Sequence, residues 1–218
     1  MAKKLAVVIG AGRGMGNHIA ERFAKENFQV VLVARHQSAL DEYATELCAK
    51  GYEVFTHAAD VSNTDSLTKL FSDVQEQFGV VDVLIYNAAF MSGGRASQIT
   101  VAEAVEHFKV DVAGALHCVQ QVLPKQIERG EGAIIFTGGL FGVYPNANFE
   151  YVCMSMDKAA LRSLAQMLNA EFKDKGIFVG IVQIMGVVSS NEHFAPKNIA
   201  EAYWQLYTER NSFEYIFD

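Results

Sequence analysis

The chain has 218 residues, 50% of them hydrophobic and 20% charged, which suits a single α/β domain spanning residues 1–218. Its formal net charge of −7 argues against nucleic acid as a partner, because phosphate binding needs clustered Lys and Arg side chains. The first apolar run, residues 5–9, is too short for a signal sequence or a membrane span, so we expect a cytoplasmic protein.

Strand-like runs rich in β-branched residues alternate along the chain with amphipathic stretches long enough for helices. They cover residues 5–9, 29–33, 53–57, 82–86, 133–137 and 177–184. Strands buried on both faces and joined by helices predict a Rossmann-type, doubly wound parallel sheet flanked by helices, with three α/β/α layers. In such folds ligands bind at the carboxyl ends of the strands.

The end of the chain adds two helices and one strand to this pattern. Residues 151–175 contain no proline and precede Gly176, with Lys173 and Lys175 in the last turn. This predicts one long helix that ends at a glycine cap. Residues 199–208 are predicted to form the last helix, and residues 213–217 a final strand.

A glycine-rich turn follows the first predicted strand. It contains Gly10, Gly12, Arg13, Gly14, Met15 and Gly16 and leads into a predicted helix over residues 17–25. Glycines let the backbone approach a pyrophosphate, and a helix N-terminus offers free N–H groups to it. The spacing G-x-x-x-G-x-G fits Gly10, Gly14 and Gly16, whereas G-x-G-x-x-G does not. We interpret the turn as a dinucleotide site; a tight connection without a ligand is the alternative.

The end of the second predicted strand indicates which dinucleotide is bound. NAD-binding proteins often carry an acid there, which accepts hydrogen bonds from the ribose 2′-hydroxyl. This chain has Arg35 and no acid. Arg35, helped by Arg13, is suited to charge-assisted hydrogen bonds with a 2′-phosphate, so NADP(H) is favoured over NAD(H). The alternative is that Arg35 is a solvated loop residue.

Together with later motifs, this turn resembles the short-chain dehydrogenase/reductase family over nearly the whole chain. Asp60-Val61 resembles the pair that holds the adenine, and Asn87-Ala88 lies in a segment similar to the family's N-N-A-G. Lys158 begins a Lys-Ala-Ala-Leu run, and residues 186–189 resemble P-G-x-V-x-T. The resemblance implies that Asn87 and Lys158 position the nicotinamide ribose. It also implies cofactor contacts from Gly186 and Val188.

The resemblance also shows which catalytic groups are missing. The family's tyrosine, four residues before the lysine, corresponds to Met154, and its serine corresponds to Gly139. The relay asparagine corresponds to Asp111, which carries a charge. Only Lys158 is unchanged. The usual acid/base and the carbonyl-polarising hydroxyl are therefore absent.

Two tyrosines are candidates to replace the missing acid/base. Tyr151 lies seven residues before Lys158, which on a helix is roughly 10 Å along the axis and too far for contact. Tyr144, in a predicted loop, could lie over the nicotinamide, where Lys158 would lower its pKa. Aromatic packing of both rings is the alternative. Ser155 points away from position 154 and is a poor substitute.

The cysteines and histidines suggest no further site. Cys48, Cys118 and Cys153 are odd in number and scattered, so we expect buried free thiols rather than disulfides or a zinc site. The histidines lie on different predicted elements and are interpreted as surface or capping residues, with no metal site. They are His18, His36, His57, His107, His117 and His193.

The predicted function is hydride transfer by an NADP(H)-dependent oxidoreductase acting on a small carbonyl/alcohol pair. A catalytically silent NADP(H)-binding regulatory protein is the alternative, favoured by Met154 and Gly139. The connection over residues 186–198 is shorter than the family's substrate lid, which predicts an open or shared pocket. By resemblance, helices around residues 110–126 and 151–170 would form a homodimer or homotetramer interface.

Overall fold

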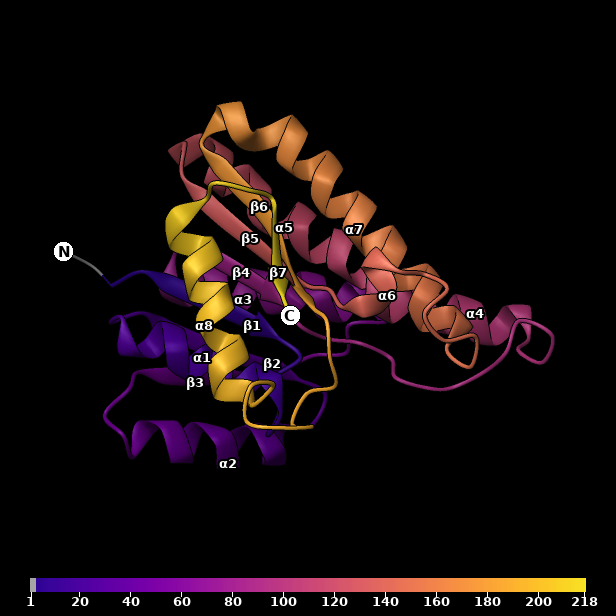
Figure 1. Cartoon of the computed structure of the whole chain (residues 1–218). Coiled ribbons are helices and arrows are strands. Elements are labelled where there is room, and N and C mark those ends of the chain that lie inside the picture. Colours follow the sequence, from indigo (N-terminus) through magenta and orange to yellow (C-terminus); the bar gives the residue numbers. More distant parts are fainter. Residues whose placement is uncertain (1–2) are drawn as a thin grey trace.

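A computed structural model of the chain describes residues 3–218 and confirms the predicted three-layer architecture (Figure 1). One seven-stranded sheet has the order β3-β2-β1-β4-β5-β6-β7, and each neighbouring pair is parallel. The strands are β1 (Leu5–Ile9), β2 (Gln29–Ala34), β3 (Val54–Ala58), β4 (Val83–Tyr86), β5 (Gly132–Thr137), β6 (Ile177–Ile184) and β7 (Glu214–Phe217). Their bounds agree with the predicted runs to within a residue at either end.

Helices cover both faces of the sheet. They are α1 (Met15–Lys25), α2 (Gln37–Cys48), α3 (Thr64–Phe78), α4 (Val101–Phe108), α5 (Gly114–Arg129), α6 (Leu140–Val143), α7 (Val152–Phe172) and α8 (Pro196–Glu209). A π-helical turn, η1 (Lys109–Ala113), joins α4 to α5, and a 3₁₀ turn, η2 (Lys173–Lys175), follows α7. Within residues 3–218, no helix is both long enough and apolar enough to cross a membrane.

Each face of the sheet has its own hydrophobic core. In β1, Leu5, Val7 and Ile9 pack on the α3, α5 and α7 side, whereas Ala6 and Val8 pack on the α1, α2 and α8 side. This alternation follows from the two-residue period of a strand. Because both faces are buried, the central strands read as continuous apolar runs, which is the pattern that predicted a parallel sheet.

The ends of the last two helices follow local backbone chemistry. Gly176 adopts a left-handed conformation, with φ of 79°, and ends the predicted long helix after η2. This confirms the glycine cap. Helix α8 begins at Pro196, earlier than predicted from residue 199, because proline fits the first turn of a helix.

Two predictions about single side chains are wrong. His107 is not a surface or capping residue: it is 1% exposed and its ring meets that of Phe90 edge-on at 4.2 Å. Cys48 is exposed rather than buried, because it lies on the solvent side of the last turn of α2. Cys118 and Cys153 are buried free thiols, as predicted.

Candidate cofactor site and active site

The glycine-rich turn contains two kinds of glycine. Gly10 has a φ of +87°, and a Cβ there would lie 2.5 Å from the backbone nitrogen of Ala88. A Cβ on Gly16 would lie 2.4 Å from the Gly10 carbonyl oxygen, whereas Cβ atoms on Gly12 and Gly14 would meet nothing within 4 Å. Gly10 and Gly16 therefore set the shape of the turn, and Gly12 and Gly14 leave space beside it.

The N-terminus of α1 lies directly after this turn. Gly14 is the N-cap residue, no side chain of residues 3–218 caps the helix, and its first turn contains no acidic residue. The first N–H groups and the positive end of the helix dipole are thus available to an anion, and Met15 is buried beneath them. The open space beside Gly12 and Gly14 and this uncapped helix end fit the pyrophosphate of a dinucleotide.

The two arginines near the turn differ in their surroundings. Arg35 is exposed and forms no ion pair within residues 3–218. Arg13 pairs with Glu42 at 2.9 Å and with Glu46 at 3.3 Å, and its guanidinium lies 5.5 Å from the ring centre of Tyr43. The sequence reasoning did not identify these acidic partners, which partly neutralise Arg13.

The loop after β3 is held by short local contacts. Asp60 accepts hydrogen bonds from the Ser62 backbone N–H at 2.9 Å and from its hydroxyl at 2.7 Å. These bonds lower the pKa of Asp60, and the nearby Arg35 adds to the effect. The Val61 carbonyl lies against Gly114, where a Cβ would be only 2.5 Å away. The loop is thereby fixed at the carboxyl end of the sheet.

Asn87 ties the ends of three strands together. Its side-chain nitrogen donates to the Gly10 carbonyl at 2.9 Å, and its oxygen accepts from the Thr137 hydroxyl at 3.0 Å. The Thr137 hydroxyl is also 2.7 Å from that of Tyr203, which is fully buried on α8. Sequence reasoning identified Asn87 but missed Thr137 and Tyr203. A hydroxyl at the end of an otherwise apolar strand was the available signal.

Lys158 reaches the same strand end from α7. Its side chain is buried, and its Nζ donates to the Thr137 carbonyl at 2.8 Å. Burial lowers the pKa of Lys158, while Asp111 and Asp157 oppose that change. The structure thus brings together Lys158 and Asn87, two residues that the sequence grouped, with Thr137 between them.

Met154 and Gly139 stand where the family has its tyrosine and serine. Met154 is half-buried on α7, and Gly139 follows β5 with its N–H donating to the Gln183 side chain at 2.7 Å. A Cβ on Gly139 would meet only the Ile184 carbonyl oxygen, at 3.5 Å, which is ordinary contact. A Cβ at position 139 would therefore fit without a shift of its neighbours.

The two candidate tyrosines make no hydrogen bond to Lys158 within residues 3–218. Tyr144 is 55% exposed, and Tyr151 is 37% exposed with its ring 5.8 Å from that of Phe141. Ser155 donates to the Pro145 carbonyl and is not directed to the site. The ring contact of Tyr151 fits the packing alternative, whereas the exposed Tyr144 stays a candidate for proton transfer.

Asp111 belongs to a buried polar cluster that includes two residues missed by sequence reasoning. It is 2% exposed and accepts a hydrogen bond from the Phe90 N–H at 3.0 Å, and burial raises its pKa. His107 has a ring nitrogen, and Asp111 and Asp157 each have a carboxylate oxygen, that lie within 4.8 Å of one another. The signal for Asp157 was an acid directly before Lys158 on the long helix.

The connection between β6 and α8 folds back on itself. The Phe194 ring packs against Gly186, where a Cβ would lie 2.3 Å from it, and the Ser189 N–H donates to the Phe194 carbonyl at 2.9 Å. Val188 is partly buried against the core. This short loop leaves Gly186 and Val188 at the carboxyl end of β6, on the side of the predicted cofactor.

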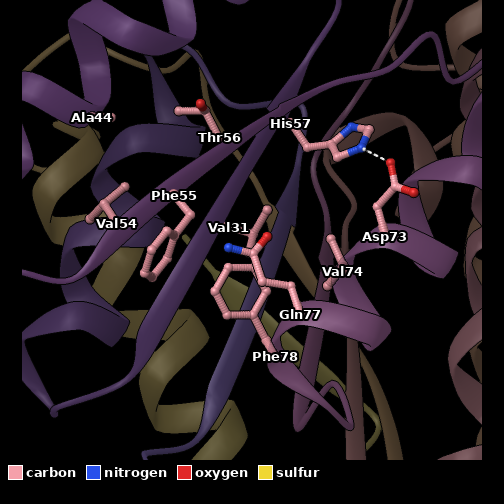
Figure 2. Close-up of a pocket in the computed structure, with 10 residues that line it drawn as sticks. All are labelled: Val31, Ala44, Val54, Phe55, Thr56, His57, Asp73, Val74, Gln77 and Phe78. Carbon is pink, nitrogen blue, oxygen red and sulfur yellow. Dashed lines mark hydrogen bonds and ion pairs between the residues drawn. The ribbon is translucent and has the colours of Figure 1, made fainter.

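A separate pocket lies along the edge strand β3. It is lined by residues of β2, β3, α2 and α3, and Figure 2 shows His57 directed toward Asp73, with the two side chains 3.0 Å apart. None of the lining residues comes from the glycine-rich turn or from α7. This pocket is therefore distinct from the candidate cofactor site.

Comparison with known proteins identifies the family to which the chain is similar. The sequence model of the short chain dehydrogenase family matches residues 4–199. The chain is 32% identical to a ketoacyl reductase, HetN, of a Nostoc species over 82% of this chain and 62% of that protein. It is 30% identical to a 3-oxoacyl-[acyl-carrier-protein] reductase, FabG, of Staphylococcus epidermidis, over 85% of this chain and 76% of that protein.

A solved structure agrees with these sequence matches. A metagenomic short-chain oxidoreductase in complex with NADP superimposes with a TM-score of 0.87 and 26% identity, covering 99% of this chain and 97% of that one. The glycine-rich turn, the strand order and the match over residues 4–199 lead to one conclusion. The chain belongs to the short-chain dehydrogenase/reductase family.

Proposed function

We propose that the protein is an NADP(H)-dependent oxidoreductase that acts on a small carbonyl/alcohol pair. The observation that carries this proposal is that the open glycine-rich turn and the buried Lys158 lie at the same carboxyl edge of the sheet. The names of similar proteins support it, since two are ketoacyl or oxoacyl reductases and one was solved with NADP. Bound NADP(H) would supply the hydride.

Each part of the cofactor would have its own set of residues. The turn from Gly10 to Gly16 would hold the pyrophosphate, Arg35 and Arg13 the 2′-phosphate, and Asp60 with Val61 the adenine. Lys158 would hold the nicotinamide ribose. The Asn87 side chain is already bonded to Gly10 and Thr137, so its role would be to keep the turn and the end of β5 in register.

The preference for NADP(H) is tested by calorimetric titration with NADPH and, separately, NADH. We expect NADPH to bind more tightly, and Arg35→Gln to weaken that preference by at least about tenfold, because a charge-assisted hydrogen bond contributes roughly 1.5–3 kcal/mol when it is well formed. Lys125→Gln removes an equivalent exposed charge from α5 and should change nothing. Equal binding of both cofactors by the unmodified protein would contradict the preference.

Turnover tests the reaction itself. A panel of aldehydes, ketones and β-ketoacyl thioesters with NADPH should give a loss of the reduced cofactor's absorbance. The thioesters are included because of the two reductases to which the chain is similar. No turnover of any acceptor at high protein concentration, with NADPH shown to be bound, would refute the proposed reaction.

A catalytically silent NADP(H)-binding protein is the second candidate, because Met154 and Gly139 replace the family's acid/base and hydroxyl. The variant carrying Met154→Tyr and Gly139→Ser separates the two functions. The Cβ of a serine at position 139 would make only ordinary contact with its surroundings. Activity that appears only in the double variant would favour the silent protein, whereas activity in the unmodified chain favours the enzyme.

A further inference from the structure

Three buried side chains from different elements surround one point between α7 and the α4–η1 junction. His107 comes from α4, Asp111 from η1 and Asp157 from α7, and they are 1%, 2% and 3% exposed. Each contributes one polar side-chain atom, a ring nitrogen or a carboxylate oxygen, and these three atoms lie within 4.8 Å of one another. Within residues 3–218 no direct hydrogen bond or ion pair joins the three.

Two polar atoms of this cluster lack a partner. The Nε2 of His107 is 2.7 Å from the Ser92 hydroxyl, and Asp111 accepts from Phe90, but within residues 3–218 no group bonds the His107 Nδ1 or the Asp157 Oδ2. A buried carboxylate without hydrogen bonds is costly unless its charge is removed. The cluster therefore needs a further proton or cation.

The charges around the cluster favour a proton. Lys158 supplies one positive charge against the two carboxylates, and His107 acts on the pKa of Asp111 in the same direction as Lys158. The other nearby groups from α7 and α4, Cys153 and Glu103, supply no positive charge. One proton would neutralise the remaining negative charge. Two carboxylates this close in a buried site do not both ionise readily. The raised pKa of Asp157, about 7, agrees with this argument.

We propose that Asp111 and Asp157 share one proton at neutral pH, and that Asp157 supplies it through Lys158 in place of the tyrosine missing at position 154. The second part rests on the proposed oxidoreductase function. Lys158 follows Asp157 on α7, and its Nζ contacts the end of β5, where the family's site lies. Asp157 is thus a proton source that acts through another residue.

Every proton and electron pair in the proposed reduction has a source and a destination. When a hydride adds to the substrate's carbonyl carbon, the carbonyl oxygen gains an electron pair and takes a proton from the Lys158 ammonium. Lys158 is re-protonated as the O–H bond of Asp157 breaks, and the carboxylate so formed is attracted electrostatically to that ammonium. Water then returns a proton to Asp157. No further oxidant or reductant is required.

Infrared spectroscopy of the full chain tests the shared proton without any need for turnover. We expect a protonated-carboxyl C=O band that disappears as the pH rises through about 7, the pKa of Asp157, in a transition that belongs to the pair rather than to one residue. Asp157→Asn should remove the band, and Asp111→Asn should move its titration to lower pH. Asp174→Asn, at an exposed aspartate, is the matched control.

Two outcomes, one from infrared spectroscopy and one from metal analysis, would overturn the proposal. One is the absence of such a band, or a band that persists unchanged in Asp157→Asn. The other is a stoichiometric divalent metal in the purified protein that is lost in both His107→Ala and Asp157→Asn, because a cation would then take the proton's place.

Steady-state kinetics tests the role of Asp157 as the proton source. In the reductive direction, kcat should fall as the pH rises through the titration of the pair, and Asp157→Asn should lower kcat by about 100-fold, a typical contribution of general acid catalysis, and flatten the pH profile. Asp174→Asn should change neither. An unchanged kcat and pH profile in Asp157→Asn would refute this role alone. A wild-type chain that binds NADPH but reduces no acceptor would refute it together with the proposed function.

Discussion

Glycines in the same turn are required for different reasons. At Gly10 the backbone that follows β4 comes so close that a Cβ would lie 2.5 Å from the Ala88 nitrogen, whereas at Gly12 the space beside the Cβ position is open. The first glycine is needed by the fold. The second is needed only if a ligand occupies the open space.

Alanine substitutions at these two positions should separate stability from binding. Gly10→Ala should lower the free energy of unfolding by about 1–3 kcal/mol or more, the usual cost of overpacking. Gly12→Ala should unfold at the same urea concentration as the wild type but bind NADPH more weakly. If Gly12→Ala left NADPH affinity unchanged, Gly12 would have no place in the cofactor site.

The acidic partners of Arg13 give a second prediction for single residues. Glu42 and Glu46 compete with a 2′-phosphate for Arg13, so a variant with Glu42→Gln and Glu46→Gln should bind NADPH about two- to fivefold more tightly, since exposed ion pairs contribute no more than about 1 kcal/mol. NADH affinity should stay the same. Glu128→Gln, at an exposed glutamate that forms no ion pair within residues 3–218, is the control for calorimetry.

At the scale of elements, a π-helical turn was not predicted. The sequence suggested one helix around residues 110–126, but η1 precedes α5 and contains Asp111. Gly114 permits this junction to pack closely, because a Cβ there would lie 2.5 Å from the Val61 carbonyl and 2.8 Å from the Tyr86 hydroxyl. The turn places Asp111 facing α7 rather than solvent.

Helix α3 allows a direct test of how local capping stabilises an element. The Asn63 side chain accepts hydrogen bonds from the N–H groups of Asp65 and Ser66 at 3.0 and 3.1 Å. Asn63→Ala should therefore lower the free energy of unfolding by about 1 kcal/mol, and Asn63→Asp should retain the stability. Urea denaturation measures both. Equal losses in the two variants would contradict the capping role.

At the scale of the whole molecule, assembly stays a prediction. Several apolar side chains on α4, α5 and α7 are exposed, among them Val105, Phe108, Leu116, Met156 and Met167. Exposed apolar side chains on these helices would suit an interface between two copies of the chain.

Sedimentation velocity tests this assembly. We expect a dimer or tetramer for the unmodified chain and a shift toward monomer in Met167→Glu, because a charge would be buried at the interface. Met91→Glu, at a loop methionine that is 77% exposed, should leave the assembly intact. A monomeric wild type would refute the prediction.

The buried acid pair should also affect the stability of the whole fold. Asp157 ionises near its pKa of about 7 in the folded chain, but near about 3.9 when unfolded. The folded chain therefore binds the Asp157 proton more tightly than the unfolded chain does. The resulting contribution to the free energy of unfolding is present at low pH and lost as the pH rises through about 7. Urea midpoints measured from about pH 5 to about pH 8 should fall less in Asp157→Asn than in Asp174→Asn or the wild type.

The sequence by itself determined the layered fold, the strand positions and the glycine-rich turn, because these depend on local periodicity and on backbone freedom at particular glycines. Lys158 and Asn87 could be grouped for the same reason, since each lies in a short motif. The absence of a tyrosine at position 154 was equally plain from the sequence.

Only the tertiary structure decided which polar groups meet. His107, Asp111 and Asp157 come from three elements, and their burial depends on how α7 packs against α4 and η1. The pairing of Arg13 with Glu42 and Glu46 likewise depends on the approach of α2 to the turn. Such contacts join residues far apart in sequence, and no local pattern encodes the packing that brings them together.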